Sequence, residues 1–312
     1  MKNIILIAVV ASLTAAQTVA RQKEEIIPIP DPLPELTAEM LIAHRGESID
    51  VPENTLPAYK TAVERGFGFE CDIYLSKDKR VFTFHDKNLT RTTAGANTNK
   101  CADVEWEGVL SKIDVGSWGK WKGSAFKGTT PALLEDVLKL ARDGRKIYVE
   151  IKTGPEIVPY VKEIFEKQKN AHPDNTLFIS FNAKACKEIK RQMPQYKCYF
   201  LDSGVRGSSK RRRPAKLDEI LAILKDTGVD GLDIRFTPKL VTEEFIKAVR
   251  DAGYELHVWT IDDLPRALLA RQRGAMTVTT NCAKKLLDEY NLLKSGKKCE
   301  KKCCEKSASS CK

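Results

Sequence analysis

Short apolar segments rich in β-branched and aromatic residues alternate along this chain with stretches whose apolar residues recur at helical spacing. This alternation is typical of βα units arranged around a parallel sheet. The predicted strands are 41–44, 69–74, 81–84, 146–151, 177–181, 197–201, 229–234, 255–260 and 276–279. These candidates are close in number to the eight strands of a (β/α)8 TIM-type barrel, so we predict an α/β protein with that fold.

The predicted helices are clearest at 54–65, 132–143, 156–169, 217–227, 242–252 and 264–273. One unit is irregular, because only eight residues separate Asp72 from Val81. A helical crossover between parallel strands needs about a dozen or more. The second βα unit is therefore predicted to lack its helix. The connection at about 87–130 is long and contains three tryptophans, so we expect an inserted segment over the site.

The two ends of the chain differ in composition from its centre. Residues 1–20 predict a secretory signal peptide, since Lys2 precedes an apolar run and then small residues. Residues 21–37 are rich in proline and acidic residues and predict a linker, 38–290 the catalytic barrel, and 291–312 a basic, cysteine-rich tail. We expect a periplasmic or secreted protein, with an uncleaved anchor as the less favoured alternative. No later stretch approaches the roughly 18 apolar residues of a membrane span, so the mature chain is expected to have none.

The formal net charge of +10 is concentrated in two short segments, 206–216 and 294–312. We interpret both as solvated surface, and no nucleic-acid partner is expected. The nine cysteines are an odd number, so at least one thiol stays unpaired even if an exported chain forms disulfides. Their pairing and the oligomeric state are left open by the sequence.

Polar side chains gather near the carboxyl ends of the predicted strands, where TIM barrels carry their functional groups. Glu70 and Asp72 are two residues apart in one strand, as are Glu150 and Lys152 in another, so each pair shares one face of its strand. Carboxylates inside apolar segments are costly unless they are paired or bind a cation. The three acidic residues therefore predict a hard-metal site with oxygen ligands, and a structural ion pair with a buried Arg or Lys is the alternative for the first two.

The order and spacing of the motifs resemble those of the glycerophosphodiester phosphodiesterase family, which belongs to the phosphatidylinositol-phospholipase-C-like barrels. The resemblance runs from Leu41 to about Asn281. It is carried by His44-Arg45-Gly46, Pro52-Glu53-Asn54-Thr55, Glu70-Cys71-Asp72, His85-Asp86, Arg91-Thr92-Thr93, Gly116-Ser117-Trp118, Glu150-Ile151-Lys152, Ser180-Phe181 and Trp259-Thr260.

The resemblance implies hydrolysis of small glycerophosphodiesters to glycerol phosphate and an alcohol. It further implies that one divalent cation, Ca²⁺ or Mg²⁺, binds to Glu70, Asp72 and Glu150, and that His44 and His85 act as general acid and base. Which histidine has which role is left open. The family's implied reaction begins with attack by the substrate's own glycerol hydroxyl, and water then opens the resulting cyclic phosphate.

Four further residues are predicted to bind the substrate or its phosphate. A phosphodiester is an anion whose charge grows in the transition state, so Arg45 and Lys152 are candidates to stabilise it. Asn54 is assigned to the same set. Trp259 is predicted to form an apolar wall for the glycerol backbone, and an aromatic core residue is the alternative.

One segment departs from the family pattern. The last barrel segment of the family usually ends in Thr-Asp-Pro, whereas this chain has Thr280-Asn281-Cys282. We place this position outside the metal and histidine set and expect the change to affect local packing. Two other functions remain as alternatives, namely a phospholipase-type phosphodiesterase acting on a bulkier lipid and a non-catalytic surface binding protein. The complete set of histidines and carboxylates favours an enzyme.

Overall fold

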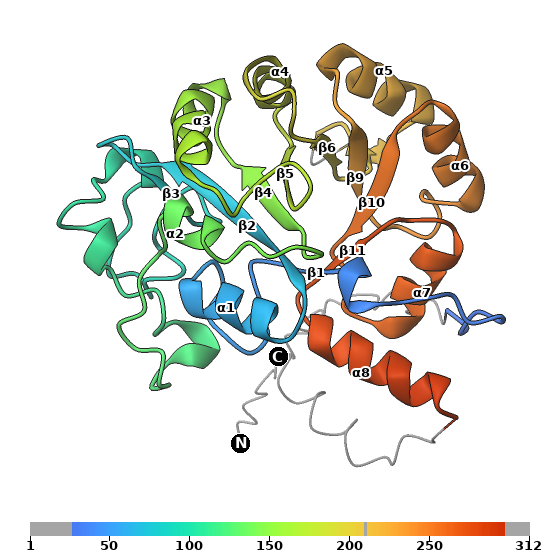
Figure 1. Cartoon of the computed structure of the whole chain (residues 1–312), viewed down its shortest axis with the longest axis horizontal. Helices are drawn as coiled ribbons and strands as arrows, with labels where there is room; N and C mark the ends of the chain where they lie inside the picture. Colours follow the sequence, from blue (N-terminus) through green and yellow to red (C-terminus); the bar gives the residue numbers. More distant parts are fainter. Residues whose placement is uncertain (1–26, 209–210, 297–312) are drawn as a thin grey trace, which may run out of the picture.

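The structure, a computed structural model, describes residues 27–208 and 211–296. Its parallel strands form a closed barrel, because the first strand pairs with both the second and the last (Figure 1). The predicted (β/α)8 fold is confirmed. In order around the barrel the strands are β1 (Leu41–Ala43), β2 (Gly68–Leu75), β4 (Ile147–Ile151), β5 (Thr176–Ser180), β6 (Cys198–Asp202), β9 (Gly231–Arg235), β10 (Glu255–Trp259) and β11 (Val278–Thr280).

Helices surround the strands (Figure 1). They are α1 (Leu56–Glu64), α2 (Leu134–Leu138), α3 (Val158–Lys167), α4 (Ala183–Gln192), α5 (Leu217–Thr227), α6 (Glu243–Asp251), α7 (Leu264–Gln272) and α8 (Ala283–Lys294). Each buries an apolar face: α6, for example, is capped by the Thr242 side chain and buries Phe245, Ile246 and Val249. Helix α5 ends at Gly228, whose positive φ of 67° allows the chain to turn back toward the barrel.

The irregular second unit is also confirmed. Strand β3 (Val81–Thr83) pairs antiparallel with β2, so a short turn joins them and no crossover helix is needed. The long segment that follows lies beside the barrel next to β3 (Figure 1). Its side chains Trp106 and Leu110 pack with Phe82 in an apolar cluster of their own. The segment contains the 3₁₀ helices η2 (Cys101–Asp103), η3 (Leu110–Lys112) and η4 (Gly119–Trp121).

Apolar side chains fill the barrel interior, and polar groups lie toward the carboxyl ends of the strands. Ile42, Tyr148, Leu177 and Tyr199 point inward and pack together. His257 belongs to this interior packing, since it is 3% exposed and its ring stacks on Tyr199 with ring centroids 4.4 Å apart. This close packing holds the carboxyl ends of the strands in fixed positions.

The ends of the barrel differ slightly from the predicted boundaries. Leu36, at the end of the predicted linker, is buried in the core, next to the 3₁₀ helix η1 (Ala38–Met40). Helix α8 continues to Lys294, beyond the predicted start of the tail at 291. The predicted signal peptide and residues 297–312 of the tail lie outside the described residues. Within the part of the chain that the structure describes, no helix is long and apolar enough to cross a membrane.

Candidate active site

The chain makes a sharp turn where β1 ends. Arg45 and Gly46 both have positive φ angles, 59° and 79°. A Cβ atom at position 46 would lie 2.6 Å from the carbonyl carbon of Ala58, so the turn requires glycine. The turn directs the backbone N–H of Arg45 to Glu70, where it donates a hydrogen bond of 2.8 Å to Oε2. Strained backbone of this kind is common at functional sites.

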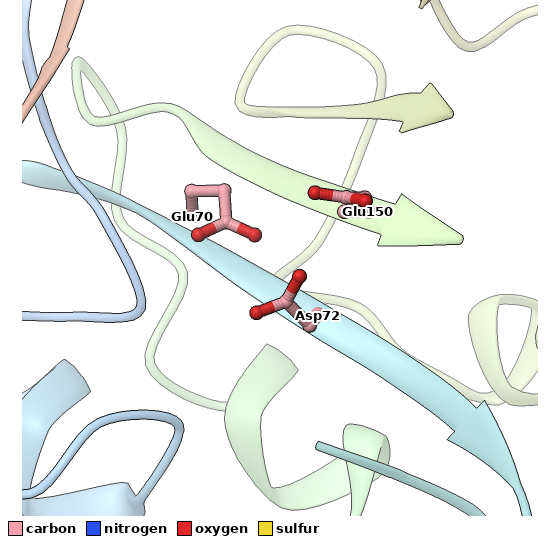
Figure 2. Close-up of side chains that lie close together, drawn as sticks. All are labelled: Glu70, Asp72 and Glu150. Carbon is pink, nitrogen blue, oxygen red and sulfur yellow. The ribbon is translucent and has the colours of Figure 1, made fainter. Parts of the chain in front are cut away.

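Three buried carboxylates lie together, two within β2 and one near the end of β4, and Figure 2 shows them on these neighbouring strands. Asp72 pairs in register with Glu150, and Glu70 precedes Asp72 by two residues on the same face. Each offers one oxygen atom, and these atoms lie within 4.8 Å of one another. Two of their buried oxygens, Glu70 Oε1 and Asp72 Oδ1, accept no hydrogen bond among the described residues. A divalent cation with oxygen ligands fits this set.

The electrostatics of the carboxylates favour binding of a cation. Burial and then the charge of Asp72 raise the pKa of Glu70 well above its usual range and that of Glu150 to about 8. Burial alone would raise the pKa of Asp72 as well, but the positive charges of Lys152 and Arg45 outweigh it and lower that pKa. A bound cation would keep all three groups ionised at neutral pH.

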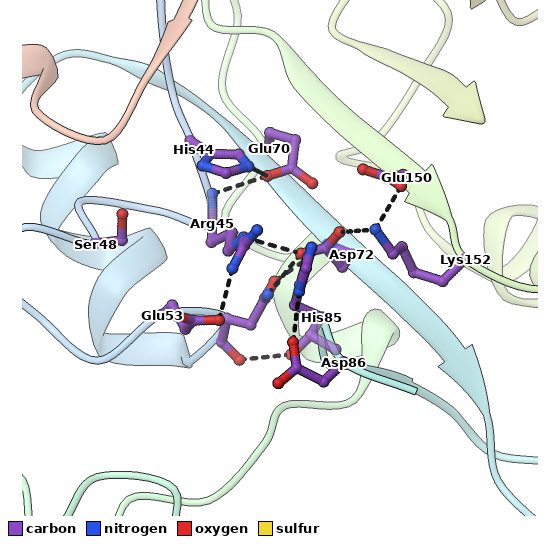
Figure 3. A network of polar contacts seen from close by, with 12 residues as sticks. His44, Arg45, Ser48, Glu53, Glu70, Asp72, His85, Asp86, Glu150 and Lys152 are labelled. Atoms are coloured by element: carbon purple, nitrogen blue, oxygen red, sulfur yellow. Dashed lines mark hydrogen bonds and ion pairs between the residues drawn. The ribbon is translucent and has the colours of Figure 1, made fainter. Parts of the chain in front are cut away.

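Both predicted cationic residues lie beside the carboxylates, as Figure 3 shows. Lys152 Nζ lies 2.7 Å from Glu150 Oε1 and 3.1 Å from Asp72 Oδ1, the second being an ion-pair contact without hydrogen-bond geometry. Arg45 lies 2.8 Å from Glu53 through Nη1 and 3.5 Å from Asp72 through Nε. The two side chains therefore concentrate positive charge where an anionic phosphate would approach.

His44 has a defined orientation at the end of β1. Its Nδ1 lies 2.7 Å from Oδ1 of Asn281, and the amide Nδ2 of Asn281 donates a 2.7 Å hydrogen bond to Asp262. Because the Asp262 carboxylate requires a donor, the Asn281 oxygen must face the histidine, so His44 carries its proton on Nδ1. Nε2 is then directed toward Glu70, 3.9 Å away. Burial and the nearby Arg45 charge lower the pKa of His44 to about 4, so the ring is neutral at neutral pH.

This contact corrects one interpretation of the sequence. We had placed position 281 outside the histidine set, and that was wrong, because Asn281 holds His44 directly. The closure of the barrel between β1 and β11 brings the two residues together. The partner of this predicted catalytic group is therefore a neutral amide.

His85 has a different partner from His44. Its Nδ1 lies 2.7 Å from Asp86 Oδ1, and Arg91 Nε donates a 2.6 Å hydrogen bond to the other oxygen of Asp86. Burial lowers the pKa of His85, while the Asp72 carboxylate opposes that shift. Since Arg91 comes from the long segment beside the barrel, that segment helps to hold His85 in place. A carboxylate partner favours the protonated imidazole more than an amide does.

Asn54 and Trp259 lie near the site in different ways. Asn54 is buried, and its amide forms hydrogen bonds with the side chain and the backbone N–H of Asp72, at 2.8 and 3.1 Å. The sequence predicted that Asn54 contacts the substrate. We propose instead that it orients Asp72. Trp259 is half-buried, donates from Nε1 to the backbone oxygen of Asp233 at 3.0 Å, and packs edge-on against Phe181. This position is compatible with the predicted wall.

These side chains surround one cavity of about 300 Å³. It is lined by His44, Arg45, Glu70, His85, Glu150, Lys152, Ile179, Phe181, Leu201, Asp233, Trp259, Thr260 and Thr279. Phe181 and Asp233 were not among the predicted site residues. The signal for Asp233 was present, because a carboxylate within the apolar segment 231–234 is as unusual as those of β2 and β4.

The sequence profile of the Glycerophosphoryl diester phosphodiesterase family matches residues 44–285, which is most of the chain. The chain belongs to this family. A glycerophosphodiester phosphodiesterase of Caldanaerobacter subterraneus is 33% identical over 162 residues, which are 51% of this chain and 64% of that relative, just under two thirds of its length. A second family member, from Bacillus subtilis, is 27% identical over 241 residues, 72% of this chain and 77% of the relative.

Solved structures of two other phosphodiesterases share the barrel. A phosphodiesterase of Oleispira antarctica, in complex with the product sn-glycerol-3-phosphate, has a TM-score of 0.68 and 24% identity, and the match covers 83% of this chain and 97% of that one. The glycerophosphodiester phosphodiesterase of Thermotoga maritima has a TM-score of 0.61 and 22% identity, with 82% and 100% covered. At these identities the structures show a common fold.

The His44–Asn281 contact leads to a testable expectation. Asn281→Leu removes the acceptor of Nδ1, so His44 loses its fixed tautomer and orientation. We expect turnover of a glycerophosphodiester to fall about 10- to 100-fold, the range for partners of this kind. Asn281→Asp keeps an acceptor and should retain most of the turnover. The test measures the turnover rate and the metal affinity of both variants. Equal rates for Asn281→Leu and the unmodified protein would contradict the assigned role.

Proposed function

We propose that this protein is an exported glycerophosphodiester phosphodiesterase that hydrolyses glycerophosphodiesters to glycerol phosphate and an alcohol. The observation that carries the proposal is the meeting of two oriented histidines and a buried carboxylate triad at one small cavity. The family match supports the same reaction. The apolar N-terminal sequence after Lys2 supports export to the periplasm or the exterior.

The partners of the two histidines support different roles for them. His44 is neutral, has its proton on Nδ1 and leaves the Nε2 lone pair free, so we assign it as the general base. His85 is backed by the Asp86 carboxylate, which favours the charged ring, so we assign it as the general acid. This assignment rests on the neighbours of each ring, an amide in one case and a carboxylate in the other.

The proposed reaction has two steps. His44 Nε2 takes the proton of the glycerol hydroxyl next to the phosphate ester, the hydroxyl oxygen bonds to phosphorus, and the bond from phosphorus to the alcohol oxygen breaks. His85 gives its proton to that leaving oxygen. In the second step the roles reverse. Water loses a proton to His85 as its oxygen bonds to phosphorus, the bond from phosphorus to the glycerol oxygen that attacked first breaks, and that oxygen gains a proton from His44. Arg45 and Lys152 stabilise the charge on the phosphoryl oxygens.

A divalent cation held by Glu70, Asp72 and Glu150 would add positive charge at the phosphoryl group. Ca²⁺ and Mg²⁺ are both candidates, because each prefers oxygen ligands. The cavity volume of about 300 Å³ suits a small diester. It gives no support to a substrate with long acyl chains at the reacting centre.

The proposal predicts that the purified chain, starting after the signal peptide, releases glycerol phosphate from at least one small diester. The panel consists of glycerophosphocholine, glycerophosphoethanolamine, glycerophosphoinositol and glycerophosphoglycerol, each with added Ca²⁺, Mg²⁺ or Mn²⁺ and with chelator. Glycerol phosphate is measured enzymatically. Lysophosphatidylcholine, which carries an acyl chain, serves as the comparison substrate and should react more slowly. No release from any member of the panel would refute the proposed function.

A further inference from the structure

One buried carboxyl group of the catalytic cavity has no role in the proposed reaction. Asp233 lies on β9, is 1% exposed and lines the same cavity as the histidines. Its Oδ1 has no hydrogen-bond partner among the described residues. Leaving a buried polar atom unpaired is unfavourable. A ligand group that hydrogen-bonds to this oxygen would remove that cost.

Asp233 is separate from the carboxylates of the metal site. The triad consists of Glu70, Asp72 and Glu150, and β5 and β6 lie between β4 and β9 in the barrel. These two strands turn apolar side chains, Ile179 and Leu201, into the cavity between the triad and Asp233. A ligand that contacts both ends must therefore have an anionic end, a short carbon chain and a polar end.

The chemistry of Asp233 favours an alcohol as its partner. Burial, and then the charge of Glu150, raises the pKa of Asp233 well above its usual range, which favours the neutral carboxyl group. A neutral carboxyl group both donates and accepts hydrogen bonds, as a hydroxyl group does. An ammonium headgroup would instead require an ionised carboxylate.

A glycerol group attached to the reacting phosphate has the required form. Its hydroxyl next to the ester is used in the proposed reaction, which leaves the terminal hydroxyl free for recognition. Trp259 stands beside this position, since its indole N–H donates to the backbone oxygen of Asp233 at 3.0 Å. The indole can cover the carbon chain while the carboxyl group binds the hydroxyl.

We propose that Asp233 is a specificity-determining residue that binds the terminal hydroxyl of the glycerol group. The inference depends on the proposed function, because it assigns one part of that substrate to one end of the cavity. It explains how the enzyme would distinguish a free glycerol end from one that is acylated or absent. A site built to hydrogen-bond a hydroxyl rejects an analogue without it, because its own polar group is then left unpaired.

The experiment compares two substrates that differ in one hydroxyl. These are glycerophosphocholine and the phosphocholine ester of propane-1,2-diol, which keeps the attacking hydroxyl and lacks the terminal one. The unmodified enzyme should prefer the first by at least about 10-fold in kcat/KM. Asp233→Leu should bring this ratio close to one by slowing the first substrate, while Asp233→Asn, which keeps a donor and an acceptor, should retain most of it.

A matched control and a binding measurement separate recognition from folding. Thr279→Val removes another unpaired oxygen from the same cavity wall and should leave the hydroxyl preference in place. Melting curves with sn-glycerol 3-phosphate or propane-1,2-diol 1-phosphate should show tighter binding of the former to the unmodified protein and equal binding of both to Asp233→Leu. If that variant does not fold, the Asp233→Ala variant takes its place.

Several results would overturn the inference. One such result is an unchanged hydroxyl preference in folded Asp233→Leu. Another is a variant that changes only the preference between choline and ethanolamine diesters, because Asp233 would then contact the leaving alcohol. Loss of the preference in Thr279→Val as well would also count against a specific role of Asp233. If the unmodified enzyme hydrolyses no diester, the proposed function itself fails, whereas an active enzyme with an unaltered preference refutes only the role of Asp233.

Discussion

Replacing either His44 or His85 by alanine should reduce turnover at least about 100-fold, the low end for loss of general acid–base catalysis. The loss should appear mainly in kcat, because proton transfer acts in the transition state more than in substrate binding. Neither histidine belongs to the carboxylate triad. Metal affinity should therefore stay close to that of the unmodified protein, which calorimetric titration with Ca²⁺ or Mg²⁺ measures.

The control for the histidine variants is His172→Ala. His172 is half-exposed on the surface, where Nε2 lies 3.2 Å from Asp143, and it does not line the cavity. Its replacement should leave kcat unchanged. If His44→Ala or His85→Ala lost the metal, or kept the turnover of the His172 control, the assignment of acid–base roles would be wrong.

Removing one metal ligand should have a different signature. Glu70→Gln, Asp72→Asn and Glu150→Gln each keep the size of the side chain and remove a charge that a divalent cation needs. We expect weaker metal binding and lower turnover, part of which returns at high cation concentration. In the same calorimetric titration, the carboxylate variants should have a clearly higher Kd for the metal, whereas the histidine variants should have a normal one. The Kd therefore distinguishes the two groups of variants.

Chelation tests the same site through stability. A cation that binds only the folded protein stabilises it by about 2.7 kcal/mol when its concentration is 100 times Kd. For a domain of this size that corresponds to a rise in Tm of roughly 5 °C or more. Chelator should remove this rise from the unmodified protein and from Glu163→Gln, which changes an exposed carboxylate on α3, but not from the triad variants. A chelator-insensitive Tm in the unmodified protein would argue against a bound cation.

Local patterns in the sequence predicted most of the barrel and the centre of the site. Alternation of strands and helices is encoded in short stretches, and helix 217–227 was predicted with the bounds of α5. The i, i+2 spacing placed Glu70 and Asp72 on one face of β2, because side chains alternate along any strand. Helix α4 was less clear, since its sequence is lysine-rich and it buries only Ala185, Cys186 and Ile189.

What the sequence determined by itself was the order of the strands and the residue types on them and directly after them, including both histidines and all three carboxylates. The tertiary structure decided which of these groups meet. Asn281 reaches His44 across 237 residues of chain only because β1 pairs with β11. Asp233 lines the cavity only because the closed barrel places β9 across from the strands that carry the triad. Spacing along a chain fixes the face on which a side chain lies, whereas its partner across a closed barrel depends on which strands become neighbours.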